Sequence, residues 1–193
     1  MKTLEILKER SGNQCELCAS TDNLSIYDVP PTASNLANRE ILACETCLDQ
    51  IEKRAELDAN HWQCLSTSMW NENIPVQVVS WRMLNRFRNE SWAADLLDMM
   101  YLDDENLEWA KQTGDHEGDG SIALHKDCNG NILVAGDTVT LIKDLDVKGS
   151  TLNAKIGTAV RNIRLVHDNV EQIEGKIDGQ MIVILTKFVK KQM

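Results

Sequence analysis

The sequence Cys15-Glu16-Leu17-Cys18 is followed by Cys44-Glu45-Thr46-Cys47, with 25 residues (19–43) between the two C-x-x-C pairs. Structural zinc sites hold the ion with four ligands in a tetrahedron, at Zn–S distances of about 2.3 Å. Two cysteines three positions apart reach one ion on a tight knuckle or on the first turn of a helix. Gly12-Asn13 supplies a turn before the first pair, and an apolar-periodic stretch follows the second. We therefore predict one structural Zn²⁺ per chain, bound by Cys15, Cys18, Cys44 and Cys47.

The spacing between the pairs exceeds the usual range of about 15–20 residues. The extra length lies in residues 27–39, which contain Pro30-Pro31 and are predicted to form the loop of a hairpin. A knuckle, a hairpin and a ligand-bearing helix over residues 44–57 would make residues 1–58 a zinc-ribbon or treble-clef module. Two chance C-x-x-C pairs, or a redox pair, are the alternatives. Four cysteines in this order favour the metal.

The predicted zinc site has no open coordination position, whereas a catalytic zinc keeps one for water. The segment Ser11–Cys18, together with residues 24–28, resembles the opening of HNH-type nucleases. Those proteins place a catalytic histidine where this chain has Tyr27 and Asp28, and no histidine precedes His61. The resemblance implies a similar scaffold without the general base. We predict no catalytic residues and a protein that is not an enzyme.

Composition points to a globular protein with a buried core. Apolar residues make up 42% of the 193 positions, and no run approaches the ~20 apolar residues of a membrane span. The first ten residues are amphipathic and charged, unlike an export signal. We therefore expect a cytoplasmic location and no membrane partner, and in that compartment six cysteines indicate metal ligands or free thiols.

Charge is unevenly distributed along the chain. Residues 1–124 contain 10 Lys/Arg and 22 Asp/Glu, a net charge of −12, whereas residues 125–193 contain 10 and 8, a net charge of +2. The two values sum to the −10 of the whole chain. Because phosphate binding needs clustered cations, the acidic first part argues against general affinity for nucleic acid.

The chain reads as an α+β protein with four parts. After residues 1–58 comes a Trp-rich helical segment, residues 59–112; a Gly- and acid-rich linker, residues 113–124; and a strand-rich part, residues 125–193. Helices are predicted near residues 4–11, 76–87, 92–101 and 105–111, and Pro75 suits a first helical turn. Strands are predicted over residues 138–142, 159–165, 171–177 and 181–185, with a tight turn at Asp178-Gly179.

Several residues outside the four cysteines admit a functional and a plain structural interpretation. His61 and Cys64 offer two metal ligands, but nothing in the sequence pairs with them, which favours a buried thiol and a surface or helix-capping histidine. Cys128 lies in a turn-like setting and is expected to be a free thiol. All five tryptophans lie in the helical segment at helical spacing, which favours core positions over a docking face. They are Trp62, Trp70, Trp81, Trp92 and Trp109.

Cations in the last part allow a second kind of function. Lys143, Lys148, Lys155, Arg161 and Arg164 lie near polar turns and could form a small basic groove for an anion or nucleic acid. A balanced strand surface is the simpler interpretation. The aromatic residues that stack on bases are not interleaved with these cations.

Eight segments of residues 125–193 resemble the PhnA (YjdM) family. The segments are Asn129-Gly130-Asn131, Gly136-Asp137-Thr138-Val139, Leu141-Ile142-Lys143-Asp144-Leu145, Val147-Lys148-Gly149-Ser150, Ile156-Gly157-Thr158, Arg161-Asn162-Ile163-Arg164-Leu165-Val166, Lys176-Ile177-Asp178-Gly179 and Phe188-Val189-Lys190-Lys191. The resemblance implies a small SH3-like β-barrel here, joined to an N-terminal zinc-ribbon-like segment whose metal role the four cysteines would fill. Short members join the two directly, whereas this chain inserts the Trp-rich segment.

The resemblance also implies an association with alkylphosphonate utilisation, but no settled biochemical activity. We therefore expect a non-enzymatic zinc-binding protein with an interaction or regulatory role, whose protein partner contacts the Trp-rich segment or the barrel. A nucleic-acid-binding module that uses the zinc finger and the cationic barrel face is one alternative. An unrecognised enzyme of phosphonate metabolism is the other, although the two-metal Asp/His clusters of known metallohydrolases are missing from the sequence.

Overall fold

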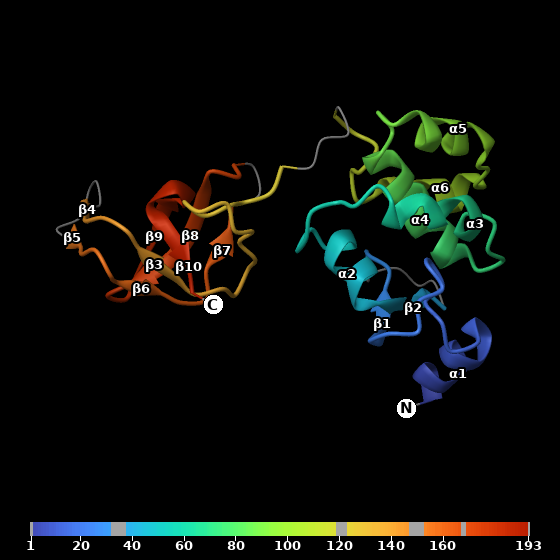
Figure 1. Ribbon diagram of the computed structural model, residues 1–193, viewed down its shortest axis with the longest axis horizontal. Helices are drawn as coiled ribbons and strands as arrows, with labels where there is room; N and C mark the ends of the chain where they lie inside the picture. Colours follow the sequence, from blue (N-terminus) through green and yellow to red (C-terminus); the bar gives the residue numbers. More distant parts are fainter. Residues whose placement is uncertain (1, 32–37, 119–122, 147–152, 167–168, 193) are drawn as a thin grey trace. The chain divides into compact units, whose positions relative to one another are not determined.

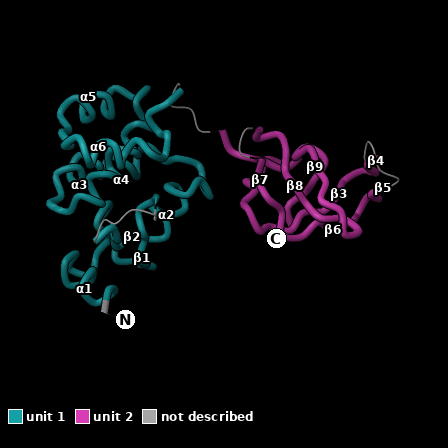
Figure 2. Tube along the Cα trace, turned by 180° about the vertical axis from the view of Figure 1, so that it is seen from behind, with its two compact units in different colours: residues 1–122 teal, residues 123–193 magenta. Residues whose placement is uncertain are grey.

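The computed structural model describes residues 2–31, 38–118, 123–146, 153–166 and 169–192. The chain divides into two compact units, Met1–Ile122 and Ala123–Met193 (Figure 2). Each unit has its own hydrophobic core. In the described ranges, every helix is too short or too polar to span a bilayer.

Within its described residues, the first unit contains six α-helices, one 3-10 helix and one β-hairpin (Figure 1). In chain order these are α1 (Lys2–Ser11), β1 (Leu24–Asp28), β2 (Glu40–Cys44), α2 (Glu45–Ile51), η1 (His61–Cys64), α3 (Leu65–Ser68), α4 (Ile74–Arg86), α5 (Ser91–Met99) and α6 (Asp104–Lys111). Strands β1 and β2 pair antiparallel, from Leu24 opposite Cys44 to Asp28 opposite Glu40. The predicted hairpin is therefore present, and the loop that joins its strands includes residues 32–37, outside the described residues.

Helix α4 is the centre of the first unit and packs against α3, α5 and α6. Pro75 occupies its first turn, as predicted, where the missing N–H costs no helical hydrogen bond. Its apolar face includes Val76, Val79 and Met83, all at most 2% exposed. Apolar residues at helical spacing thus place the helix in the core, because only one face needs to leave water.

The predicted zinc module and the Trp-rich segment share one core. Cys47 and Ile41 of the module belong to the same buried cluster as Trp62 and Leu84 of the segment. Trp62 and Trp109 are buried at 0% and 5% exposure, and Trp81 and Trp92 pack against the cluster. Trp70 differs, because its side chain is 58% exposed. The sequence suggested separate zones here, but the described residues 2–31 and 38–118 share one hydrophobic core.

Arginines of α4 and the following turn anchor the ends of other elements. Arg82, 4% exposed, donates to the carbonyls of Trp109 and Ala110 near the end of α6. Arg86 donates to Gln50 O and Ile51 O at the end of α2, and the left-handed φ of 59° at Lys53 ends the helix well before residue 57. The last carbonyls of a helix have no partner within the helix, and cations are favourable at that end.

The first half of the predicted linker is packed rather than free. Asp115 forms a buried ion pair with Arg86 at 2.8 Å, with side-chain exposures of 4% and 7%. Arg88 donates to the backbone carbonyls of Asp115, Glu117 and Gly118. Residues 113–118 therefore belong to the first unit, and residues 119–122 of the predicted linker lie outside the described residues. The sequence indicated a linker because its glycines and acidic residues show no apolar periodicity. The arginines that hydrogen-bond to this segment lie 27 or more positions earlier, so local sequence could not reveal the contact.

The second unit consists of short strands and one 3-10 helix (Figure 1). They are β3 (Val139–Leu141), β4 (Leu145–Asp146), β5 (Asn153–Ala154), β6 (Ala159–Val160), β7 (Arg164–Leu165), β8 (Gln172–Ile177), β9 (Gln180–Leu185), η2 (Thr186–Phe188) and β10 (Val189–Lys191). The described strands pair as three antiparallel sheets, in the orders β10-β3-β6, β4-β5 and β7-β8-β9. The strand predicted over residues 159–165 is interrupted, because Asn162 adopts a left-handed φ of 53° between β6 and β7.

The hairpin of β8 and β9 is the longest regular element of this unit. Asp178 and Gly179 form its two-residue turn with φ values of 48° and 85°, as a type I′ turn requires. Gly175 lies on β8, where a Cβ atom would overlap the side chain of Val160 on β6. The absence of a side chain at this position therefore lets the two strands approach closely.

A mixed helix and strand architecture is what the sequence predicted. The strand-rich unit does not show a closed barrel within its described residues, because the pairings end at the borders of the three sheets. The SH3-like barrel therefore stays a prediction. Residues 147–152, which follow β4, lie outside the described part of the chain.

Candidate metal centre

The first C-x-x-C pair lies on a tight knuckle. Gly12 and Asn13, with φ values of 64° and 60°, turn the chain out of α1. The N–H of Cys15 then donates to Ser20 O at 2.7 Å, and the N–H of Ala19 donates to Cys15 O at 2.9 Å. These bonds close a loop around Cys15 and Cys18, so both side chains point to one side.

The second pair lies where β2 meets α2. Cys44 ends the strand and is the N-cap residue of the helix, and Cys47 lies in the first helical turn. The antiparallel register of β1 and β2 brings this junction next to the knuckle, because Leu24 opposes Cys44. The structure therefore brings the four predicted cysteines together from two segments far apart in sequence.

The four sulfur atoms have the spacing of a tetrahedral thiolate site. All four lie within 4.8 Å of one another. Sγ of Cys15 is 3.8 Å from Sγ of Cys47, and Sγ of Cys18 is 3.5 Å from Sγ of Cys44. A tetrahedron with Zn–S bonds of about 2.3 Å has edges of about 3.8 Å. The cysteines are free rather than disulfide-bonded. The four residues could therefore hold a metal ion such as zinc.

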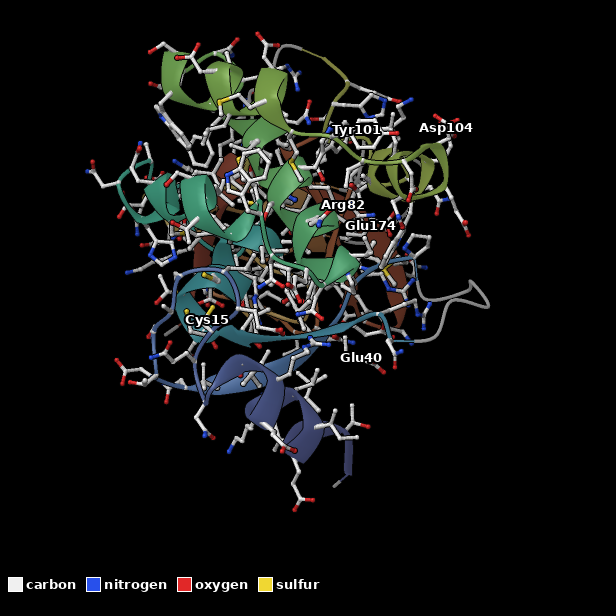
Figure 3. All side chains as sticks on the ribbon, turned by 90° about the vertical axis from the view of Figure 1, so that its right-hand side faces the viewer. Cys15, Glu40, Arg82, Tyr101, Asp104 and Glu174 are labelled. Carbon is white, nitrogen blue, oxygen red and sulfur yellow. The ribbon has the colours of Figure 1, made fainter. Side chains whose placement is uncertain are left out.

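The cluster is shielded from water on most sides. Cys15, Cys44 and Cys47 are at most 3% exposed, and Cys18 is half-buried. Figure 3 shows sulfur atoms gathered beside the labelled Cys15. Among the residues the structure describes, this is the one group of three or more potential ligands with this mutual spacing.

The crowded thiols do not ionise independently. Hydrogen bonds from Cys18 and Cys47 lower the pKa of Cys15 well below that of an ordinary thiol. The hydrogen bond to Cys15 raises the pKa of Cys47 far above its ordinary value. Four thiolates this close repel one another, and a cation among them removes the repulsion. The geometry therefore suits a bound cation better than four free thiols.

Glu16, between the first two cysteines, connects the knuckle to α1, to β2 and to the residue before α4. Its side chain is 2% exposed and pairs with Arg10 of α1 through two bonds of 2.7 and 2.8 Å. It also accepts a hydrogen bond from the N–H of Leu42 on β2, at 2.8 Å, and one from Asn73 before α4, at 3.4 Å. The sequence analysis did not identify this residue, since nothing local distinguishes it from an exposed glutamate.

His61 lies beside the metal centre, contrary to the surface or helix-capping position suggested by the sequence. Its Nε2 is 3.1 Å from Sγ of Cys47. Cys64, on the same 3-10 helix, is half-buried, and burial raises the pKa of its thiol to about 11. The H-x-x-C spacing was visible in the sequence, but its relation to Cys47 depends on the packing of η1 against α2.

The positions compared with HNH nucleases carry a half-buried tyrosine and an ion-paired aspartate instead of a histidine. Burial raises the pKa of Tyr27, and Asp28 forms an ion pair with Arg39 at 3.5 Å. Cys128, in the second unit, is exposed and contacts Asn129, as expected for a free thiol. None of these three residues adds a ligand to the four-cysteine group.

The second unit has a groove of about 710 Å³ along the outer side of β9. Met181 and Val183 of that strand are 53% and 58% exposed, and residues 143–146 and Phe188 complete its walls. Lys143 Nζ lies 3.8 Å from the centre of the Phe188 ring. The groove is thus lined by apolar residues of β9 together with three charged residues, Lys143, Asp144 and Asp146.

The cations named in the sequence analysis are partly neutralised. Lys155 pairs with Asp144 at 3.2 Å, while Arg161 and Arg164 are exposed. Lys148 lies outside the described residues. A basic surface built from all five cations is therefore not evident in the described part of the second unit.

Together, these features define a two-unit α+β protein with a four-cysteine site able to hold a metal ion in one unit and short paired strands in the other. Comparison with known proteins assigns the family. Residues 125–192 match the PhnA domain (YjdM). The chain is 49% identical over 85 residues to Protein YjdM of Escherichia coli K12, covering 44% of this chain and 74% of that protein. The chain belongs to the YjdM family.

Two further relatives give the same assignment. Identity to Protein YjdM of Streptococcus mutans is 53% over 66 residues, which cover 34% of this chain and 59% of that protein. Identity to the YjdM homolog of Haemophilus influenzae is 43% over 75 residues, which cover 39% of this chain and 58% of that protein. The domain matched by the family, residues 125–192, lies within the second unit.

Proposed function

We propose that this chain is a non-enzymatic zinc-binding protein in which one Zn²⁺ holds the first unit together and the second unit contributes an interaction surface. The observation that carries the proposal is the spacing of the four sulfur atoms, all within 4.8 Å of one another. Zinc suits this donor set, because four thiolates in a tetrahedron form the usual structural site. In such a site the binding free energy of the metal stabilises the fold.

The same donor set supports a structural rather than a catalytic role. Four thiolates complete the coordination shell, whereas hydrolytic zinc needs a position for water. The burial of Cys15, Cys44 and Cys47 also keeps substrate away from the ion. We therefore propose that the metal stabilises the zinc-ribbon or treble-clef module and takes no part in a reaction.

For the second unit we propose an SH3-like fold with a protein-binding role. The groove beside β9 supports this role, because contiguous exposed apolar side chains mark interaction sites. The association with alkylphosphonate utilisation implied by the family resemblance would then be regulatory or supportive. A cytoplasmic location accords with six free cysteines.

Nucleic-acid binding is the less favoured function. The −12 charge of residues 1–124 opposes it, and the pairing of Lys155 with Asp144 reduces the positive charge available to phosphates. Binding to DNA or RNA that weakens steeply with added salt would favour this function instead. If the protein does not bind DNA or RNA at low salt, this function is excluded.

Metal analysis of the purified full chain tests the zinc proposal. We expect about one zinc per chain, and we expect Cys44→Ser to lose it because the shell would lack one thiolate. Cys128→Ser is the matched control, since Cys128 is exposed in the other unit and should leave the zinc content unchanged. Stoichiometric zinc in Cys44→Ser would contradict the assignment of the site.

A further inference from the structure

A histidine contacts one of the four cysteines from outside the coordination group. Nε2 of His61 lies 3.1 Å from Sγ of Cys47. His61 is half-buried, while Cys47 is fully buried. His61 is not a member of the group of four residues whose donor atoms all lie within 4.8 Å of one another. It is therefore placed to contact a ligand rather than to replace one.

The position of His61 is fixed by its neighbour. Trp62 is fully buried, and its Nε1 donates to Oε1 of Gln50 at 2.8 Å. Gln50 lies on α2, the helix that carries Cys47, and its Oε1 also accepts the N–H of Asp58 at 2.8 Å. The His61 ring meets the Trp62 ring edge-on, with centroids 5.4 Å apart. Helix η1 is thereby held against α2, and the imidazole has little freedom to leave Cys47.

We propose that His61 is a positioning residue of the metal centre and donates a hydrogen bond from Nε2 to the thiolate of Cys47. The inference rests on the proposed zinc site. A metal-bound thiolate keeps excess negative charge on sulfur, and a charge-assisted N–H donor stabilises that charge. Groups that hydrogen-bond to metal ligands orient them, and their loss typically costs about 10–100-fold in metal affinity.

Two consequences follow for the centre. The hydrogen bond holds Cys47 in the rotamer that faces the ion, so zinc leaves the site more slowly. It also withdraws electron density from the sulfur, so the thiolate is a poorer nucleophile toward alkylating reagents. Both effects are local to Cys47, because it is the cysteine with which the imidazole is within hydrogen-bond distance.

Zinc release from the full-length, zinc-loaded protein to a chromogenic chelator tests the inference. His61→Phe keeps an aromatic ring against Trp62 but has no donor, and we expect zinc release about tenfold faster or more. His61→Gln places an amide nitrogen near the position of Nε2 and should restore most of the loss. Gln63→Ala is the matched control, because Gln63 is exposed on the same 3-10 helix.

A spectroscopic measurement separates the hydrogen bond from a merely structural effect. In the cobalt-substituted protein, loss of a donor to a thiolate shifts the sulfur-to-metal charge-transfer band to lower energy. We expect this shift in His61→Phe, a smaller one in His61→Gln and none in Gln63→Ala. If His61→Phe does not fold, His61→Leu provides the same comparison without a donor.

The outcomes distinguish this inference from the zinc proposal. A wild-type protein that holds no zinc overturns both. A wild-type protein that holds zinc, with release rate and charge-transfer band unchanged in a folded His61→Phe, overturns only the role of His61. Faster release with the band shift, reversed by His61→Gln, supports it.

Discussion

The two units of this protein bury their interiors by different means. The first unit gathers four cysteines, the buried Glu16 and the buried Arg82 around a core that also contains tryptophans. The second unit has an almost wholly aliphatic core of Val, Leu and Ile residues from short strands, and its cysteine, Cys128, is exposed. The first unit thus combines an apolar core with a four-cysteine group that could hold a metal ion, whereas the core of the second unit is formed by aliphatic side chains.

This difference predicts which changes should lower the stability of each unit. Ligand sites and buried ion pairs lose much of their stabilisation when one partner is removed, because the remaining groups are left buried without compensation. Packed aliphatic cores respond instead to changes in volume. The following predictions separate these two responses.

Removal of zinc should have the largest effect and should be confined to the first unit. Structural zinc contributes on the order of 10 kcal/mol to folding, so a strong chelator should unfold much of residues 2–118. Hydrogen exchange on the full chain measures both units in one sample, and β8 and β9 serve as the internal control. Unchanged protection of α2 and β2 after zinc is removed would contradict the proposed role of the metal.

Gly175→Ala should destabilise the second unit by about 3 kcal/mol, because its Cβ would overlap Val160 and overpacking of a rigid core is costly. Urea unfolding followed by hydrogen exchange in β8 and β9 measures the effect. Val160→Ala makes space for the new methyl group, so the double variant should be less destabilised than the sum of the two single variants. Strict additivity would show that the close approach of β8 and β6 does not limit stability.

Glu16→Ala should lower the free energy of unfolding of the first unit by about 2 kcal/mol. The substitution removes the ion pair with Arg10 and leaves the buried Leu42 N–H without its acceptor, and a buried unsatisfied donor costs about 1–3 kcal/mol. Thermal unfolding of the zinc-loaded chain provides the measurement. Glu9→Ala, at an exposed position of α1, is the control and should be nearly neutral. Equal effects of the two substitutions would argue against a role for the buried carboxylate.

Asp127→Asn should have the smallest effect and lower the free energy of unfolding by about 1 kcal/mol at neutral pH. Hydrogen bonds to a charged acceptor contribute more to stability than those to a neutral one, by about that amount. Burial opposes ionisation of Asp127, but hydrogen bonds from Lys191, Asn131 and Asn129 outweigh it and lower the pKa of the carboxyl group. A lowered folded-state pKa gives stability that is present above the unfolded value of about 3.9 and is lost as the pH falls through the folded value.

The pH dependence provides the check on this prediction. The stability of the second unit should fall below about pH 4 in the wild type and less so in Asp127→Asn, so the two curves should converge in acid. Asp178→Asn is the control, because either residue tolerates the left-handed turn position. Curves for Asp127→Asn that stay parallel to the wild type at low pH would exclude this carboxylate as a source of the acid sensitivity.

Much of the fold could be predicted because its signals are local. Helical spacing of apolar residues predicted α4, α5 and α6 to within a few positions, and Asp178-Gly179 predicted the turn between β8 and β9. The errors lie where a distant group or a backbone conformation intervenes. Arg86 hydrogen-bonds the last carbonyls of α2, and Lys53 after it adopts a left-handed φ, so this helix is shorter than predicted. The left-handed Asn162 divides the predicted strand over residues 159–165.

Local spacing was enough to identify the cysteines that could share a metal ion, because C-x-x-C spacing restricts two thiols to one side of a turn. Segments of residues 125–192 were likewise enough to identify the family. The surroundings of the cysteines, in contrast, depend on the three-dimensional packing of the chain. Glu16 acquires its partners from α1 and β2, and His61 reaches Cys47 through the burial of Trp62. These contacts depend on packing between elements, and packing is set by shape and burial over long sequence separations rather than by local spacing.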